Sequence, residues 1–161
     1  MVACKDDHVN PKIPSLNLTK DEKMKISQNS LRKAILKEQE QIKNYLKRQN
    51  LLCIELPSGV HYLVLDSTRH HQKPTAGQVL RVSYDLKLMD GTVIETNKSE
   101  LLSIDFQDKE SGLFEAIKKM NEGESAIIII PSYRAHGLAG DDNKIPPMST
   151  LIYHIKIEAF L

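Results

Sequence analysis

Few residues of this chain have the types and spacing that nucleophilic or metal-dependent chemistry requires. The two cysteines, Cys4 and Cys53, are far apart and neither belongs to a Cys-x-x-Cys pair, so we expect no zinc site. His70 and His71 are adjacent, and neighbouring side chains of an extended segment point to opposite sides, which disfavours a shared metal ion. We recognise no catalytic triad motif and no glycine-rich phosphate loop. We therefore expect a function that needs no metal and no cofactor.

Cys4 is the residue whose surroundings predict a covalent modification. Val-Ala-Cys4 is similar to the end of a bacterial lipobox, where a signal peptidase cuts before a cysteine that is then acylated; Met1 would then replace the signal peptide. The Lys-Asp-Asp that follows is similar to the export signal of surface lipoproteins in Bacteroidetes-type bacteria. Acyl chains bind a bilayer with about 0.8 kcal/mol per buried CH₂. We expect membrane anchoring through a lipidated Cys4; the alternative is an idle thiol in a polar tail.

The charge balance argues against a nucleic-acid partner. Lys and Arg number 22 against 21 Asp and Glu, a net charge of +1, whereas proteins that bind phosphate backbones need a basic surplus. The longest purely apolar run, Ala126 to Ile130, is far shorter than the roughly 20 residues of a membrane-spanning helix. A length of 161 residues with 40% hydrophobic residues is typical of one globular domain with a single core.

Three segments with different patterns are expected to position these residues. Residues 1–18 are largely polar and contain two prolines, which predicts a flexible tether. Residues 19–50 open on a Thr-x-x-Glu capping box and contain no glycine or proline, which predicts a long amphipathic helix. Residues 51–161 alternate in the manner of β-strands and form the expected domain.

The apolar stripe of the predicted helix leaves three arrangements open. Its members are Met24, Leu31, Ile35, Ile42 and Leu46. The helix could pack along the domain, pair with a second copy of the chain, or stand apart to place the domain or meet a partner. Polar residues at Gln28 and Glu38 interrupt the stripe, which disfavours a strict coiled coil.

The alternating region predicts an α+β fold, in which a curved antiparallel sheet wraps around one short helix. A leading hairpin over 51–66 turns at Pro-Ser-Gly. Further strands are predicted over 79–88, 92–96, 101–106, 126–130 and 150–160, with the helix over 113–121. The strand over 126–130 is apolar on both sides, which predicts a central position covered on both faces.

From about Ser58 onward, the chain contains a series of short motifs, which are Gly77-Gln78, Val-Ser-Tyr84, Asp90-Gly91-Thr92, Gly112-Leu113, Gly123-Glu124, Ile-Pro131-Ser132 and Ile145-Pro146-Pro147. Their order and spacing resemble those of the FKBP family of peptidyl-prolyl isomerases. The preceding helix, the leading hairpin and the lipobox-like cysteine are most similar to the FKBP-like, gliding-motility-associated lipoproteins of Bacteroidetes-type bacteria. This implies an outer-membrane lipoprotein of a bacterial cell envelope, facing the periplasm or the surface.

The resemblance also implies a groove for a prolyl ring, with proline-containing polypeptides as partners. The implied substrate-binding residues are Tyr84, Ile94, Glu95, Leu102, Leu113, His136, Ile145 and Tyr153. Several of them depart from the family pattern. Ile94 and Leu102 stand where the family has aromatic residues, Glu95 replaces an aspartate, and Leu113 stands at the floor, where tryptophan is common.

Three further departures concern hydrogen bonding. Tyr153 falls where phenylalanine is usual, and His136 takes the place of a tyrosine whose hydroxyl holds the substrate backbone. Lys109-Glu110-Ser111 replaces an apolar pair whose backbone amide binds the ligand carbonyl. We expect the loss of this apolar pair to weaken the binding of macrolide inhibitors and, in part, turnover.

The implied chemistry is rotation about a peptide bond, which meets a barrier of about 18–20 kcal/mol. Twisting the amide reduces its charge separation, so a water-poor aromatic groove favours the twisted state without nucleophile or metal. Two functions remain open: a peptidyl-prolyl isomerase acting on exported or envelope proteins, and a non-catalytic FKBP-like lipoprotein that binds or assembles partners. Retention of Tyr84, Ile145 and Tyr153 favours the isomerase, whereas Ile94, His136 and the loop before Gly112 favour the binding module.

Overall fold

The computed structural model describes residues 19–68, 72–104 and 109–161. Cys4, His70 and His71 lie outside the described residues, so the expected lipidation site stays a prediction. The chain divides into two compact units, Met1–Lys33 and Ala34–Leu161. The second unit begins inside the N-terminal helix and includes its C-terminal part; the expected division into tether, helix and domain stays a prediction.

The N-terminal helix α1 extends over Lys20–Gln49, as its sequence pattern predicts. Thr19 and Glu22 form the expected capping box: the Glu22 amide donates to Thr19 Oγ1 (3.3 Å), and the Thr19 amide donates to Glu22 Oε2 (2.8 Å). In the first unit, the apolar side chains of Met24 and Leu31 are exposed. Pairing of this segment with a second copy stays a prediction.

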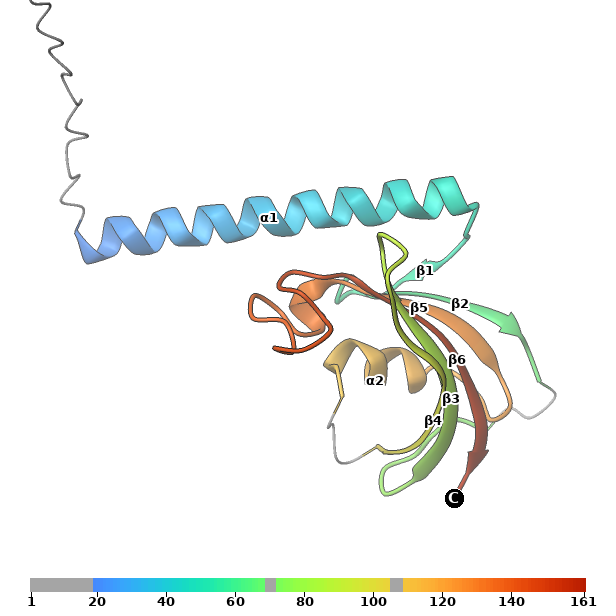
Figure 1. Cartoon of the computed structure of the whole chain (residues 1–161). Helices are drawn as coiled ribbons and strands as arrows, with labels where there is room; N and C mark the ends of the chain where they lie inside the picture. Colours follow the sequence, from blue (N-terminus) through green and yellow to red (C-terminus); the bar gives the residue numbers. More distant parts are fainter. Residues whose placement is uncertain (1–18, 69–71, 105–108) are drawn as a thin grey trace, which may run out of the picture. The chain divides into compact units, whose positions relative to one another are not determined.

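The second unit is an α+β domain built on one antiparallel sheet, which confirms the expected fold class. The strand order is β1-β2-β5-β6-β3-β4, and the sheet curves around the helix α2 (Figure 1). The elements are β1 (Ile54–Glu55), β2 (His61–Asp66), β3 (Val79–Leu88), β4 (Val93–Ser103), α2 (Ser111–Ile117), β5 (Ser125–Ile130), the 3₁₀ turn η1 (Ser132–Arg134) and β6 (Leu151–Phe160). The leading hairpin is present, although β1 comprises only two residues.

Two elements differ from their predicted bounds. The strands predicted over 92–96 and 101–106 are one strand, β4, because the polar residues between them pair with β3 through backbone hydrogen bonds that need no apolar side chain. Asn97, with a left-handed φ of 49°, lies near the register shift between Tyr84 and Leu86. Helix α2 ends at Ile117 rather than at residue 121, because the amides of Lys119 and Met120 donate to the carbonyls three residues back, in a tighter turn.

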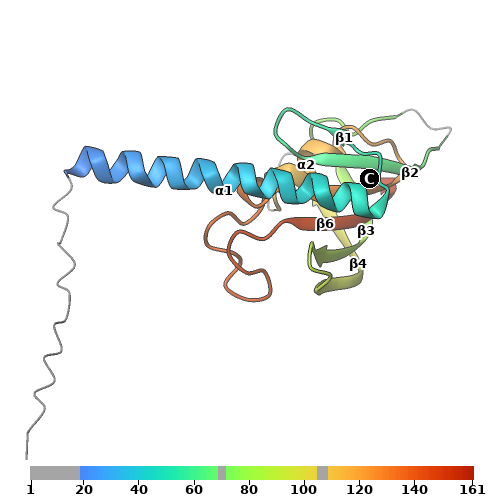
Figure 2. The same cartoon turned by 90° about the horizontal axis from the view of Figure 1, so that it is seen from above.

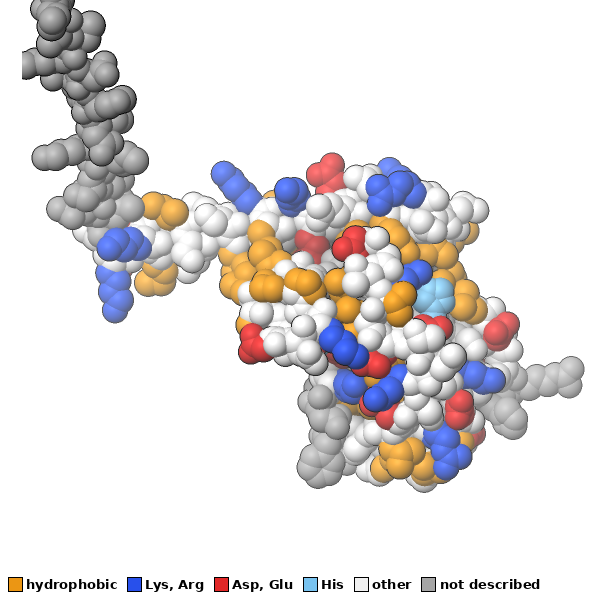
Figure 3. Space-filling view, in the orientation of Figure 1, with side chains coloured by type: hydrophobic (Ala, Val, Ile, Leu, Met, Phe, Trp, Pro, Cys, Tyr) orange, Lys and Arg blue, Asp and Glu red, His pale blue; other side chains and the backbone are white. Residues whose placement is uncertain are grey.

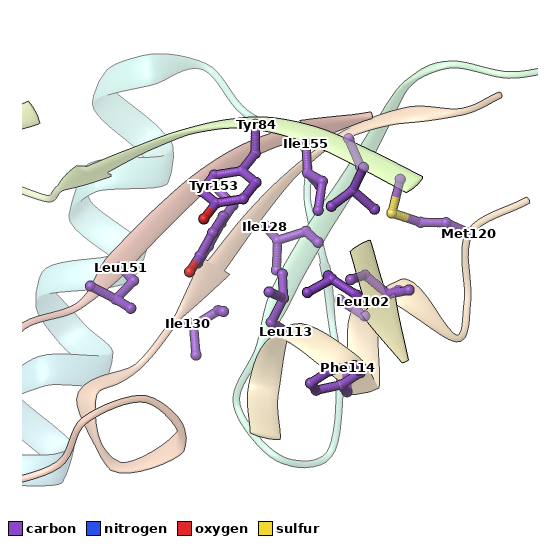
Figure 4. Packing of buried hydrophobic residues seen from close by; sticks show 14 of the residues in the cluster. Tyr84, Leu102, Leu113, Phe114, Met120, Ile128, Ile130, Leu151, Tyr153 and Ile155 are labelled. Carbon is purple, nitrogen blue, oxygen red and sulfur yellow. The ribbon is translucent and has the colours of Figure 1, made fainter. Parts of the chain in front are cut away.

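The two faces of the sheet bury different clusters. On the face toward α2, alternate residues of β5 and β6 pack with the helix; Figure 4 shows Ile128, Tyr153 and Leu113 in this main core. On the opposite face, Ile127 and Ile129 pack with residues of α1 and β6. The members of this smaller cluster are Ile42, Tyr45, Ile127, Ile129 and Ile152. The part of α1 from Ala34 onward therefore packs on the domain (Figure 2), and β5 is covered on both faces as predicted.

The surface of the domain mixes positive, negative and apolar side chains (Figure 3), as the near-neutral composition predicts. None of the helices that the structure describes is long and apolar enough to cross a bilayer. In the same described ranges, no three His, Cys, Asp or Glu side chains gather in a way that could hold a metal ion.

Candidate functional site

A cavity of about 670 Å³ lies where β3, β4 and β6 meet the start of α2 and the loop between β5 and β6. Its volume is within the roughly 300–1,000 Å³ of small-molecule sites. Six of the eight expected substrate-binding residues line it: Tyr84, Ile94, Glu95, His136, Ile145 and Tyr153. Leu102 and Leu113 do not; they are 1% and 0% exposed and belong to the main core, in the same cluster as the two tyrosines.

Tyr84 and Tyr153 form the aromatic wall of the cavity. They extend from the neighbouring strands β3 and β6, whose inward positions alternate with exposed ones. Their ring centroids are 5.2 Å apart with an interplanar angle of 60°, a tilted arrangement that aromatic pairs favour. Figure 4 shows the two rings side by side. Both rings are almost fully buried in the free protein, so a ligand would meet their edges rather than open faces.

Glu110, immediately before α2, joins two residues of the cavity. Its Oε2 accepts a hydrogen bond from the Tyr153 hydroxyl (3.0 Å), and its Oε1 is 2.9 Å from Nε2 of His136. Glu110 is only 7% exposed. Burial, with the negative charge of Glu110 adding to it, raises the pKa of Tyr153, so its hydroxyl stays protonated and donates.

This arrangement changes the expected role of His136. We expected the imidazole to hold the substrate backbone, but its Nε2 is engaged with Glu110. Glu110, His136 and Tyr153 are three of the positions at which the chain departs from the FKBP pattern, and all three meet in one hydrogen-bonded group. The departures are therefore linked in the structure rather than independent.

Lys109 contributes a second polar group on the other side of Tyr84. Its Nζ is 3.1 Å from Glu100 Oε1, 3.3 Å from the Tyr84 hydroxyl and 5.6 Å from the centroid of the Tyr84 ring. Burial alone would lower the pKa of Lys109, but hydrogen bonds with Glu100 and Tyr84 outweigh it and raise that pKa. Lys109 thus stays charged at the cavity wall, next to an aromatic ring that cations favour.

The loop between β5 and β6 closes one side of the cavity and is fixed by its own hydrogen bonds. Asp141 Oδ1 accepts from the amides of Asn143 (3.0 Å) and Ile145 (2.6 Å), and the Ile145 amide in particular lowers the pKa of Asp141. Gly140 has a φ of 77°, and a side chain there would collide with the Ile145 carbonyl. These contacts hold Ile145 against the cavity.

An ion pair connects this loop to β4. Lys144 Nζ lies 2.9 Å from Glu95 Oε1, and this hydrogen bond lowers the pKa of Glu95. Glu95, expected to contact substrate, is therefore already paired within the protein. The pair is partly exposed, so a bound peptide can reach it from solvent.

Six charged residues of the cavity lining were not among the expected site residues: Lys98, Glu100, Lys109, Glu110, Asp141 and Lys144. Lys109 and Glu110 were recognised only as losses from the family pattern. The available signal was that Glu110 and Tyr153 bring polar groups to positions where the family has apolar ones, while His136 replaces one hydrogen-bonding side chain by another. Together the apolar walls can bind a small ring, and the polar rim can hydrogen-bond to an extended backbone.

The comparisons with known proteins agree with this geometry. Residues 70–158 match the family model for FKBP-type peptidyl-prolyl cis-trans isomerase. A probable FKBP-type peptidyl-prolyl cis-trans isomerase FkpA of Neisseria meningitidis serogroup B is 30% identical over 102 residues, 62% of this chain and 37% of that protein. Outer membrane protein MIP of Legionella longbeachae is 29% identical over 106 residues, 65% of this chain and 45% of that protein. The match thus spans less than half of each of these two relatives.

The fold is also found among solved structures. A crystal structure of a peptidyl-prolyl cis-trans isomerase from Pseudomonas syringae superimposes with a TM-score of 0.67 at 24% identity, covering 80% of this chain and 94% of that one. At this identity the likeness supports the fold, whereas the family model covers more than half of the sequence itself. This chain therefore belongs to the FKBP-type peptidyl-prolyl cis-trans isomerase family.

Proposed function

We propose that this protein catalyses the cis–trans isomerisation of Xaa-Pro bonds in polypeptides. The observation that carries the proposal is that Tyr84, Ile145 and Tyr153, expected from the family pattern, line one cavity of suitable volume in a domain of that family. Other residues of the cavity depart from the family pattern, but the wall formed by these three side chains, on which the chemistry depends, is present.

The proposed mechanism requires only binding. A prolyl ring enters between the tyrosine edges and Ile145, which removes the Xaa-Pro amide from water. Because the twisted amide has less charge separation than the planar one, this water-poor wall stabilises the twisted state more than either planar isomer. The polar rim around Lys109 and the Glu95–Lys144 pair is placed to bind the flanking backbone. No proton transfer or covalent step is needed.

A kinetic test uses exchange of prolyl peptides with different residues before proline, followed by protease coupling or NMR. Unaided exchange takes tens of seconds, so catalysis is readily seen. Tyr84→Ala should lower kcat/KM by roughly tenfold or more, because losing a buried aromatic wall removes about 1.5–3 kcal/mol of apolar contact. Tyr62→Ala, which changes a partly exposed tyrosine of β2 outside the cavity lining, is the matched control. No acceleration by the wild-type protein on any peptide would leave only the binding function.

We also propose that the protein is an envelope lipoprotein related to the FKBP-like gliding-motility group, anchored by an acylated Cys4. The similarity to a relative named as an outer membrane protein supports an envelope location. The lipobox-like Val-Ala-Cys4 supports the anchor. Mass spectrometry of the protein made from its native precursor should show a diacylglyceryl adduct on Cys4 that Cys4→Ala abolishes. An unmodified Cys4 in the mature protein would contradict the anchor without touching the isomerase proposal.

A further inference from the structure

A second buried carboxylate lies outside the cavity, in the part of α1 that belongs to the domain. Glu38 is 6% exposed, although it lies on a helix whose neighbouring polar side chains are in solvent. It accepts three short hydrogen bonds: from the Ser132 amide (2.7 Å), the Ser132 hydroxyl (2.8 Å) and the Thr150 hydroxyl (2.6 Å). Burying a carboxylate is unfavourable unless such donors compensate it, so this arrangement fixes the positions of all three donors.

The two partners of Glu38 stand at the two ends of the loop that closes the cavity. Ser132 follows β5 after one proline, and Thr150 immediately precedes β6. Between them lie six residues of the cavity lining, which are Ala135, His136, Asp141, Asn143, Lys144 and Ile145. One side chain of α1 therefore ties together both ends of this loop. The loop is also tied to α2, because Arg134 pairs with Glu115 (3.1 Å) and its carbonyl accepts a hydrogen bond from the Ser111 hydroxyl (3.3 Å).

Backbone hydrogen bonds carry this constraint from Ser132 to the cavity. The Ser132 carbonyl accepts from the amides of Ala135 (3.0 Å) and Gly137 (2.8 Å), which flank His136 on either side. The Gly137 carbonyl in turn accepts from the Met148 amide (2.8 Å), near the other end of the loop. A displacement of Ser132 would therefore move His136, and with it the partner of Glu110.

We infer that Glu38 is a positioning residue for prolyl-peptide binding: it holds the loop from Ser132 to Thr150 in the geometry that shapes the cavity. The inference rests on the proposed isomerase function. Glu38 does not touch the cavity and acts only through the loop. If the loop is released, a peptide must order it on binding. The apparent affinity then falls in proportion to the fraction of molecules in which the loop is already in place.

The test is Glu38→Gln in the full chain, which keeps the size of the side chain but removes the charge and one acceptor. Since the loop contacts substrate in the ground and transition states alike, we expect KM to rise about tenfold while kcat changes by less than about twofold. Glu40→Gln is the matched control, because Glu40 is exposed on the same helix two residues away. Ile157→Val changes a buried residue at the far end of β6 and controls for a general loss of stability. KM is compared between the variants at an equal fraction of folded protein.

A second measurement separates failure of this inference from failure of the proposed function. Native-state hydrogen exchange of the Ser132, Ala135 and Gly137 amides should accelerate in Glu38→Gln and stay unchanged in Glu40→Gln. If the wild-type protein has no isomerase activity, the proposed function fails and this exchange alone decides whether Glu38 holds the loop. If the protein is active and KM of Glu38→Gln equals that of both controls, the inference is overturned. Should Glu38→Gln not fold, Thr150→Val, which removes one donor, must raise KM in the same direction.

Discussion

Two of the buried glutamates, Glu38 and Glu110, are nearly equally hidden from water, at 6% and 7% exposure, but their surroundings differ. Glu38 accepts three hydrogen bonds of 2.6–2.8 Å from a backbone amide and two short hydroxyl side chains. Glu110 accepts a hydrogen bond from the Tyr153 hydroxyl (3.0 Å) and pairs with Nε2 of His136 (2.9 Å). Both of these side chains line the cavity. The comparison suggests a division of roles, in which Glu38 fixes backbone and Glu110 sets the polarity of the binding wall.

The largest expected effect is a decrease in the free energy of unfolding when Glu38 is replaced. Glu38→Ala leaves three neutral donors without their acceptor at a buried contact; each buried donor left unpaired costs about 1–3 kcal/mol, so the three together cost roughly 3 kcal/mol or more. We expect the free energy of unfolding, measured with urea, to fall by about that amount. Glu40→Ala, which changes an exposed residue of the same helix, should change it by less than about 0.5 kcal/mol. Equal losses in the two variants would remove the distinction between Glu38 and an ordinary surface acid.

Removing Glu110 should have a smaller effect, because one of its two partners, His136, is partly exposed and can turn to water. The Tyr153 hydroxyl, in contrast, would be left buried and unpaired in Glu110→Leu. We expect this variant to lose about 1–3 kcal/mol of unfolding free energy.

The double variant Glu110→Leu/Tyr153→Phe tests the reason for that loss. It replaces both partners by apolar groups, which leaves no unpaired hydroxyl, so it should recover most of the stability. A double variant whose loss of unfolding free energy equals the sum of the two single losses would show that Glu110 and Tyr153 do not act as a pair. Isomerase assays on the same proteins would report how the polarity of the wall affects turnover.

The contrast between the two glutamates also shows which features a sequence can predict. Repeating patterns are local, so the helix α1, the antiparallel strands and the inward direction of Tyr84 and Tyr153 follow from the spacing of neighbouring residues. The order of the motifs also predicted a binding groove, and six of the eight residues expected there line the cavity. The register of β4 and the end of α2 were less predictable, because backbone hydrogen bonds there override the side-chain pattern.

Partnerships across the chain could not be predicted from the sequence. Glu38 interrupts an apolar stripe, and we interpreted it as a break in a coiled-coil pattern, whereas its partners lie 94 and 112 residues further on. The partners of Glu110 are 26 and 43 residues away. A charged residue in an apolar position is a signal that a buried acceptor needs donors, but the donors are identified only once the fold places them.

A partly exposed acid in the same loop, Asp141, provides the smallest and most specific test of whether burial causes these effects. Asp141 caps the amides of Ile145 and Asn143, and these hydrogen bonds lower its pKa in the folded protein. A lowered folded-state pKa stabilises the protein above the ordinary value near 3.8, and this contribution is lost as pH falls through the folded-state pKa. Asp141→Asn should therefore be less stable than wild type at pH 7, and the difference should shrink toward zero in acid.

The matched control for Asp141 is its neighbour Asp142, which is exposed and also has a left-handed φ, of 57°, that asparagine tolerates. Urea unfolding of wild type, Asp141→Asn and Asp142→Asn between pH 7 and strongly acidic pH should show a pH-dependent gap for Asp141→Asn alone. This difference in unfolding free energy should be smaller than the decreases in the Glu38 and Glu110 variants, because solvent weakens the interactions of a partly exposed carboxylate. A gap as large as that of Glu110→Leu would mean that loop capping, rather than burial, determines how strongly an acid stabilises this domain.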